Sequence, residues 1–252
     1  MKNPDFGAPR LFIEADLAAS RRIELSREQA HYLRHVLRLG DGAGILVFNG
    51  RDGEWLARLA SDGRRLSSIE AVEERRPQTD PGDLHLLFAP LKHARLDYMV
   101  QKAVEMGASR LSPVITRRTQ VARLNLDRML ANAVEAAEQC GILSLPEILA
   151  PTPLPQAIAG LEKRRQLVFC DEAADNQDAI TVLKGLEPGP LAVLIGPEGG
   201  FDEDERRFLL ARPATTRLSL GPRIMRADTA AVAALALVQA CVGDWARPGT
   251  HK

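Results

Sequence analysis

Short apolar runs separated by glycine-containing turns mark the first third of the chain. The runs cover residues 11–13, 45–48, 55–59 and 66–69, and Asp-Gly or Asn-Gly pairs stand at 41–42, 49–50, 52–53 and 62–63. Dipeptides of this kind suit tight turns that need positive φ, and they commonly join antiparallel strands. The pattern therefore predicts an antiparallel β-domain in the form of a small barrel.

One helix is predicted to interrupt these strands. Ser26 is a favourable N-cap residue, and Glu28 and Gln29 follow it in the first helical turn. Helical spacing of the larger side chains continues as far as Gly40. We expect the helix to end there, because glycine commonly terminates helices.

A polar segment separates this region from the rest of the chain. Residues 73–83 read EERRPQTDPGD and contain no large apolar side chain, which is typical of an exposed linker. We predict a β-barrel domain over 1–75, a linker over 76–83 and a second domain over 84–252.

Strand and helix patterns alternate through the second domain. The predicted strands cover 84–89, 111–115, 166–170, 191–195 and 217–220, and the predicted helices cover 96–106, 126–139, 202–211 and 228–242. This alternation is typical of a parallel sheet covered by helices. The predicted fold class is α/β with an all-β attachment.

Charge and cysteine content limit the kinds of partner and site that the chain is expected to have. Lys plus Arg and Asp plus Glu both number 33, so any contact with a nucleic acid must be a local patch rather than an overall basic surface. The cysteines, Cys140, Cys170 and Cys241, form no CxxC pair, so neither disulfides nor a zinc site is indicated. The longest charge-free stretch, residues 229–243, is shorter than the about 20 residues that span a bilayer. We expect a soluble, cytoplasmic protein without a membrane span.

Two loops that contain glycine and proline follow the last two predicted strands. They read IGPEGGF (195–201) and LGPRIMRADTA (220–230), at the strand ends where an open parallel sheet binds its ligands. Neither loop has the spacing of the common phosphate-binding motifs. Backbone groups, apolar side chains and Glu198 better suit an adenosine carrying a positively charged sulfonium. Two turns that merely connect strands to helices are the alternative.

These loops carry a resemblance to a known family. IGPEGGF followed by LGPRIMRADTAAVAAL resembles the signature of the RsmE family, the 16S ribosomal RNA uridine N3-methyltransferases of the SPOUT superfamily. Residues 91–121 and EAAEQC at 135–140 are similar to further family segments, and HYLRHVLRLGDG at 31–42 resembles the family's PUA-like barrel. The resemblance covers most of the chain.

The resemblance implies a SPOUT-type parallel sheet threaded through a trefoil knot, a PUA-like N-terminal barrel, and S-adenosylmethionine bound at the knot. The residues that it assigns to the cofactor pocket are Gly196, Glu198, Gly199, Gly200, Leu220, Gly221, Ile224, Met225 and Arg226. It also implies a homodimer that acts on 16S rRNA of the small ribosomal subunit. The apolar segment 230–242 suits a helix buried against a partner, or one buried within a single subunit.

Methylation of uridine at N3 requires loss of the imino proton and stabilisation of charge on the ring carbonyl groups. Arg226 is the candidate for carbonyl stabilisation, and contact with an RNA phosphate or a carboxylate is its alternative. Asp228 and Glu198 are candidate proton acceptors, although each could instead cap the following helix. The chain departs from the family at RADTA (226–230), where R-T-E-T-A is usual, and at Ile142, where an arginine is common.

Cations of both domains are candidates for RNA phosphate contacts. They are Arg10, Arg34, Arg38, Lys92, Arg95, Lys102, Arg117 and Arg118. For each one alone a solvated surface charge is the alternative, and Lys102 is spaced to pair with Glu105 on a helix. His31 and His35 are four apart, but no third ligand follows at a metal-site spacing, so we expect no metal.

Three other functions compete with this hypothesis. One is a non-catalytic RNA-binding protein on the same scaffold, and another is a SPOUT methyltransferase with a different RNA target. A nucleotide- or dinucleotide-dependent enzyme is disfavoured because the phosphate motifs are missing. Binding of S-adenosylmethionine separates a methyltransferase from the first and third of these.

Overall fold

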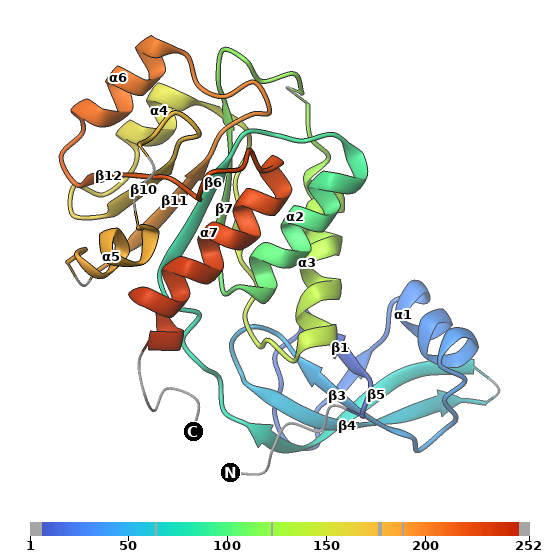
Figure 1. The fold of residues 1–252 in the computed structure, drawn as a ribbon. Coiled ribbons are helices and arrows are strands. Elements are labelled where there is room, and N and C mark those ends of the chain that lie inside the picture. Colours follow the sequence, from blue (N-terminus) through green and yellow to red (C-terminus); the bar gives the residue numbers. More distant parts are fainter. Residues whose placement is uncertain (1–6, 64, 122, 176–177, 188, 247–252) are drawn as a thin grey trace. The chain divides into compact units, whose positions relative to one another are not determined.

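The chain divides into two compact units. A computed structural model describes residues 7–63, 65–121, 123–175, 178–187 and 189–246. The first unit is Met1–Asp80 with Ala137–Leu145, and the second is Pro81–Ala136 with Pro146–Lys252 (Figure 1). The sequence assigned 137–145 to the second domain, but this segment bonds to strands of the first unit. The Phe12 N–H donates to Glu138 Oε1 (2.8 Å), and Arg76 Nη2 donates to the Gly141 carbonyl (2.9 Å).

A five-stranded sheet forms the first unit, in the order β1-β3-β4-β5-β2. Its strands are β1 (Arg10–Phe12), β2 (Arg22–Glu24), β3 (Gly44–Phe48), β4 (Glu54–Asp62) and β5 (Arg65–Arg76). β4 pairs antiparallel with β3 and β5, and β5 with β2, as predicted. The prediction is wrong for β1, which runs parallel to β3. The two strands are joined by β2 and a helix, and a long connection of this kind permits parallel pairing.

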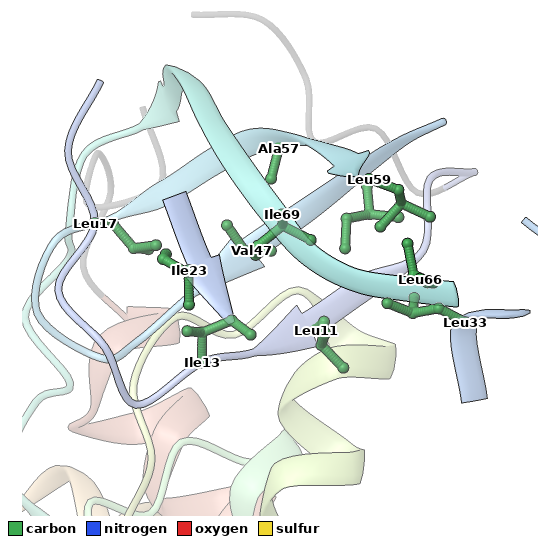
Figure 2. Close-up of a cluster of buried hydrophobic side chains, with 11 residues drawn as sticks. Leu11, Ile13, Leu17, Ile23, Leu33, Val47, Ala57, Leu59, Leu66 and Ile69 are labelled. Atoms are coloured by element: carbon green, nitrogen blue, oxygen red, sulfur yellow. The ribbon is translucent and has the colours of Figure 1, made fainter. Parts of the chain in front are cut away.

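The apolar runs of the sequence form the core of this unit (Figure 2). Ile45 and Val47 of β3 point into it, while Leu46 between them lies outside the cluster, as expected for alternating strand side chains. Leu59 and Ile69 meet them from β4 and β5, and all four side chains are at most 2% exposed. Burial of each such side chain stabilises the unit by about 1.5–3 kcal/mol.

The predicted helix is present but shorter than expected. α1 (Arg27–His31) begins with a capping box, in which the Gln29 N–H donates to Ser26 Oγ (3.2 Å) and the Ser26 N–H donates to Gln29 Oε1 (2.9 Å). It continues as a π-helical turn, η1 (Tyr32–Val36). The helix ends before Gly40 because Arg38 takes a left-handed conformation, with φ of 56°.

A seven-stranded parallel sheet forms the second unit. Its strands are β6 (Leu84–Phe88), β7 (Arg110–Ile115), β8 (Glu147–Ile148), β9 (Thr152–Pro153), β10 (Gln166–Cys170), β11 (Leu191–Ile195) and β12 (Thr215–Leu218). The order is β12-β10-β11-β6-β7-β8, with β9 also paired to β7, and every pair is parallel. The carboxyl ends of all these strands therefore meet at one edge. The knot that the resemblance implies stays a prediction.

Helices cover both faces of this sheet (Figure 1). They are α2 (His93–Glu105), α3 (Leu126–Cys140), α4 (Leu154–Ala159), α5 (Ala179–Lys184), α6 (Glu203–Ala211) and α7 (Ala227–Cys241), followed by the short turn η2 (Asp244–Ala246). Leu194 and Phe169 pack with Leu154 of α4 and Leu209 of α6 on one face. On the other face, α7 packs against β11, α2 and α5. Burial on both faces explains why β11 is a continuous apolar run and why β6 and β10 each contain a single polar residue, His85 and Gln166.

The last helix is strongly apolar. The segment Ala227–Ala246 has 20 residues and a mean hydropathy of 1.5, so by length and composition alone it is able to cross a membrane. Core helices of soluble proteins meet the same criterion. Here Ala231, Ala234, Leu235 and Val238 are buried in the second unit, so one face of the helix belongs to its core.

Candidate active site

The loop after β11 is a compact turn built on glycine. A Cβ placed on Gly196 would lie only 2.9 Å from Phe201 Cδ2. Phe201 is fully buried and packs edge-on against Phe169, with 5.0 Å between ring centroids. Gly200 has φ of 67°, and its N–H donates to the Pro197 carbonyl (2.9 Å). The packing leaves room for backbone alone at Gly196, so main-chain groups are brought close to any neighbouring ligand.

The start of α6, which follows this loop, is saturated by its own carboxylates. Asp202 Oδ1 accepts the Glu205 N–H (2.8 Å), and Glu205 Oε2 accepts the Asp202 N–H (3.1 Å). Arg117 Nη1 donates to Asp202 (2.7 Å) and to Asp204 (2.9 Å). The Glu205 N–H first and Arg117 next lower the pKa of Asp202, and Arg117 is the largest cause that lowers the pKa of Asp204. This helix start is therefore not open to a ligand.

The loop after β12 leads into α7. Gly221 in this loop has φ of 102°, a conformation that favours glycine. Ile224 is 92% exposed. Arg226 is the N-cap residue of α7, with extended backbone and no side-chain capping hydrogen bond, and its side chain is exposed.

A third loop, the one after β10, lies beside these two loops. The Asp171 side chain is completely buried and accepts hydrogen bonds from Arg206 Nε (3.2 Å) and Arg217 Nε (2.8 Å). Arg206 also donates through Nη2 to Glu172 Oε1 (2.8 Å). Burial first, and then the Asp171 carboxylate, raise the pKa of the Cys170 thiol to about 12, so this thiol is neutral at physiological pH. Two arginines thus fix the acidic pair that follows β10.

The three loops line one cavity of about 270 Å³, named the donor cavity below. The lining residues are Cys170, Asp171, Glu172, Ile195, Gly196, Pro197, Glu198, Gly199, Gly200, Ser219, Leu220, Gly221, Pro222, Arg223, Ile224, Met225, Ala227 and Ala230. All the residues that the sequence assigned to a cofactor pocket line it except Arg226. The sequence reasoning missed Asp171 and Glu172, although an acidic pair directly after a predicted parallel strand was a visible signal.

The chemistry of this lining fits S-adenosylmethionine. Gly196, Gly199 and Gly200 present backbone, and Leu220 and Met225 present apolar side chains. A neutral adenosine needs contacts of these kinds. Three carboxylates and one guanidinium complete the lining: Asp171, Glu172, Glu198 and Arg223. Arginines pair with each of these carboxylates, so the fit to the donor depends on the backbone and apolar groups rather than on net negative charge.

Comparison with known proteins establishes the family. An RNA methyltransferase domain model matches residues 78–239, and an RNA methyltransferase PUA domain model matches residues 25–71. A ribosomal RNA small subunit methyltransferase E from Rickettsia conorii is 32% identical over 236 residues, which cover 91% of this chain and 94% of that protein. The chain belongs to the RsmE family. The predicted fold class, a SPOUT-type parallel α/β sheet with a PUA-like N-terminal domain, is confirmed.

Two solved structures that are similar to this chain contain the methyl donor. A ribosomal RNA small subunit methyltransferase E from Neisseria gonorrhoeae bound to S-adenosylmethionine is 26% identical, with a TM-score of 0.83 over 94% of this chain and 99% of that one. A putative methyltransferase from Legionella pneumophila in complex with S-adenosylmethionine is 28% identical, with a TM-score of 0.80 over 92% and 97% of the two chains.

The structure divides the candidate RNA-contacting cations of this RsmE family member into those already paired with carboxylates and those that are exposed or lie at a cavity. Arg10 does not fit that role, because its side chain is 3% exposed and bonds Glu54 Oε1 (2.9 Å). Lys102 pairs with Glu105 (2.6 Å), and Arg117 is engaged by the carboxylates before and within α6. Arg34 and Arg38 are exposed in the first unit. Lys92, Arg95 and Arg118 come together around a second cavity beside the donor cavity.

The two histidines considered as metal ligands form a ring contact. The His31 and His35 centroids are 4.8 Å apart. Among the residues that the structure describes, no group of three His, Cys, Asp or Glu side chains is placed to hold a metal ion.

Proposed function

We propose that this RsmE family member transfers a methyl group from S-adenosylmethionine to N3 of a uridine in the 16S rRNA of the small ribosomal subunit. The observation that carries the proposal is the donor cavity, where three loops at the carboxyl edge of the parallel sheet present glycine backbone, apolar side chains and carboxylates. The Neisseria gonorrhoeae relative binds S-adenosylmethionine. The name of the Rickettsia conorii relative supports the RNA substrate.

The donor would be held by residues of all three loops. Gly199 and Gly200 would bring main-chain groups to the adenosine, Leu220 and Met225 would pack against it, and the arginine-paired carboxylates of Glu172 and Glu198 would lie near the sulfonium. When bound, S-adenosylmethionine supplies the methyl group, whose bond to sulfur breaks with its electron pair on sulfur as the bond to N3 forms. The protein must bring the base to that methyl group and remove the imino proton.

Glu198 is the better placed of the two candidate proton acceptors. It lines the donor cavity, and Arg95 forms an ion pair with its carboxylate. Asp228 is outside the lining, and its Oδ1 accepts the N–H of Thr229 (3.0 Å). We therefore assign the imino proton to Glu198. Arg226, exposed between the lining residues Met225 and Ala227, is assigned to the developing charge on the uracil carbonyl groups.

The proposal includes a homodimer in the cytoplasm, acting without a membrane. One face of α7 is buried in its own subunit, whereas Val232, Ala233, Ala236 and Leu237 are only partly covered. A partly covered apolar face of this kind favours contact with a second protein surface.

Two measurements test the proposed function. Titration calorimetry with S-adenosylmethionine should show binding, and a flat titration favours the non-catalytic RNA-binding protein instead. Mass mapping of 16S rRNA from a deletion strain should show loss of one 3-methyluridine and its return on complementation. Loss of a different modified nucleotide favours another RNA target. Protection from thermal unfolding by NAD or ATP, without protection by S-adenosylhomocysteine, favours a nucleotide-dependent enzyme.

A further inference from the structure

A second cavity opens beside the donor cavity on the same edge of the sheet. It has a volume of about 330 Å³ and is lined by residues that follow β6, β7 and β11. The sheet order β10-β11-β6-β7 puts β11 between the strands that carry the two cavities. Pro197, Glu198 and Gly199, in the loop after β11, line both cavities. This loop is the wall that the cavities share.

Ligands in these two cavities are held close together. Neighbouring strands lie about 4.8 Å apart, so β10 and β6, on either side of β11, are about 10 Å apart. Methyl transfer needs the nucleophile about 3–3.5 Å from the methyl carbon. Two ligands that meet at the edge of the shared wall would satisfy this requirement.

The cavities differ in charge. The donor cavity is lined by three carboxylates and one cation. The second cavity is lined by three cations and one carboxylate: Lys92, Arg95, Arg118 and Glu198. Because arginines pair with all three carboxylates of the donor cavity, the contrast lies in the second cavity, whose cations suit a base whose ring oxygens become negative as N3 loses its proton.

Lys92 and the start of α2 are the donors that this cavity offers. Arg95 pairs with Glu198, and Arg118 Nη1 donates to the Gly199 carbonyl (2.5 Å). Lys92 is exposed, and we find no ion pair for it within the described residues. It is the N-cap residue of α2, which has no side-chain capping hydrogen bond and no acidic residue in its first turn. The N–H groups at a helix start carry positive partial charge, and in α2 the third of them, that of Arg95, already donates to the Lys92 carbonyl (3.2 Å). α6, in contrast, is fully capped.

We propose that the second cavity receives the uracil base of the target nucleotide, an inference that rests on the proposed function. Lys92 and the first two amides of α2 donate to one ring carbonyl oxygen, the other carbonyl is left to Arg226, and N3, which lies between those carbonyls, faces Glu198 in the shared wall. The base enters one cavity and the donor the other, so the developing negative charge of the base meets the cations of the second cavity. Uracil is favoured over cytosine, because its two carbonyl groups accept hydrogen bonds on both sides of N3.

A cavity-filling variant tests the inference. Ala94 lines the second cavity and not the donor cavity, so Ala94→Phe should fill the base site alone. With RNA from a deletion strain, we expect single-turnover methylation to fall by about 100-fold. S-adenosylmethionine affinity and RNA affinity should change by less than about threefold, because phosphate contacts dominate RNA binding. Ala131→Phe is the matched control, since Ala131 is exposed on α3 and lines neither cavity.

The outcomes separate this inference from the proposed function. Wild-type turnover in folded Ala94→Phe would overturn the inference, as would an equal loss of donor affinity, and both leave the methyltransferase assignment intact. A wild-type chain that binds no donor would instead refute the proposed function itself. Thermal unfolding of both variants checks that they are folded.

Lys92 supplies an independent readout. Lys92→Met should lower turnover at saturating RNA by at least about tenfold, as expected for loss of a hydrogen-bond donor at developing charge. A lysine that only contacts phosphate behaves differently. Its loss weakens RNA binding and reduces the salt dependence of binding by about one unit of slope, with turnover at saturation unchanged. That second pattern would contradict the role of Lys92 in base binding.

Discussion

The ring of Phe201 occupies the space that a side chain on Gly196 would need. A Cβ at Gly196 would lie 2.9 Å from Phe201 Cδ2 and 3.0 Å from Cζ. The phenylalanine cannot yield easily, because it is fully buried and its ring meets Phe169 at an interplanar angle of 82°. Packing of the core therefore determines where the loop after β11 presents its backbone.

Gly196→Ala should disturb both the core and the donor cavity. Overpacking of this kind typically costs about 1–3 kcal/mol of unfolding free energy. We expect a lower midpoint in thermal unfolding and weaker binding of S-adenosylmethionine in calorimetry. Gly189→Ala is the control, because a Cβ at Gly189 meets nothing within 4 Å. Equal stability of the two variants would show that Phe201 has room to move.

Much of the second unit could be predicted from apolar runs. Residues 166–170 and 191–195 coincide with β10 and β11, since a strand buried on both faces of a parallel sheet is apolar at nearly every position. α4 and α5 escaped prediction because each has six residues, too few to establish a helical period. The pairing of β1 with β3 also escaped, because local turn signals describe hairpins and carry no information on a distant partner.

The parts of the site that depend on backbone shape could be predicted from the sequence. The parts that depend on ion pairs between residues far apart in the sequence could not. Glycine and proline in the loops after β11 and β12 mark unusual backbone directly. Sequence reasoning did not single out Asp171 and made Arg10 a candidate for RNA contact, yet both residues are buried. Asp171 meets an arginine 46 positions away, and Arg10 meets Glu54 at a separation of 44. Such pairs are fixed by the tertiary fold, so single-residue reasoning cannot find them.

Asp171→Asn should loosen the loop after β10. Removing one member of a buried ion pair leaves the other charge uncompensated, at a cost of about 3–5 kcal/mol. Because Arg206 and Arg217 are partly exposed at 14% and 32%, we expect the lower end of this range. Chemical denaturation measures the loss, and calorimetry should show weaker donor binding.

Glu203→Gln is the control for this variant. Glu203 contacts Arg206 at 3.5 Å, but its side chain is 82% exposed, and exposed pairs contribute little. If Asp171→Asn were no less stable than Glu203→Gln, the buried ion cluster would not hold the loop.

Arg226→Ala should separate donor binding from turnover. Arg226 is exposed and outside the lining of the donor cavity, so affinity for S-adenosylmethionine should be retained. If its guanidinium stabilises charge on the uracil carbonyls, single-turnover methylation should fall by about 100-fold. Arg207→Ala, at a side chain 76% exposed on α6, serves as the control. Unimpaired methylation by Arg226→Ala would exclude the proposed role.

His85 should make stability depend on pH. It lies in β6, and burial first, followed by the charges of Arg165 and Arg110, lowers its pKa from 6.5 to about 4. Above pH 6.5 the imidazole is neutral in both the folded and the unfolded chain. Between these two pKa values the unfolded chain binds a proton that the folded chain excludes, so the free energy of unfolding falls as the pH falls. Below about pH 4 this group causes no further loss.

The size of the His85 effect is measurable by substitution. A shift of this extent corresponds to a loss of up to about 3 kcal/mol across the interval. Urea unfolding at several pH values gives the free energy of unfolding of wild type and of His85→Gln as a function of pH. These free energies should diverge over that interval, and that of the variant should depend less on pH. The difference between the curves cancels the contribution of carboxylates such as Asp83, whose lowered pKa also costs stability in acid. His93→Gln, at an exposed histidine of α2, should follow wild type. Parallel curves for wild type and His85→Gln would mean that the folded chain protonates His85 as readily as the unfolded chain does.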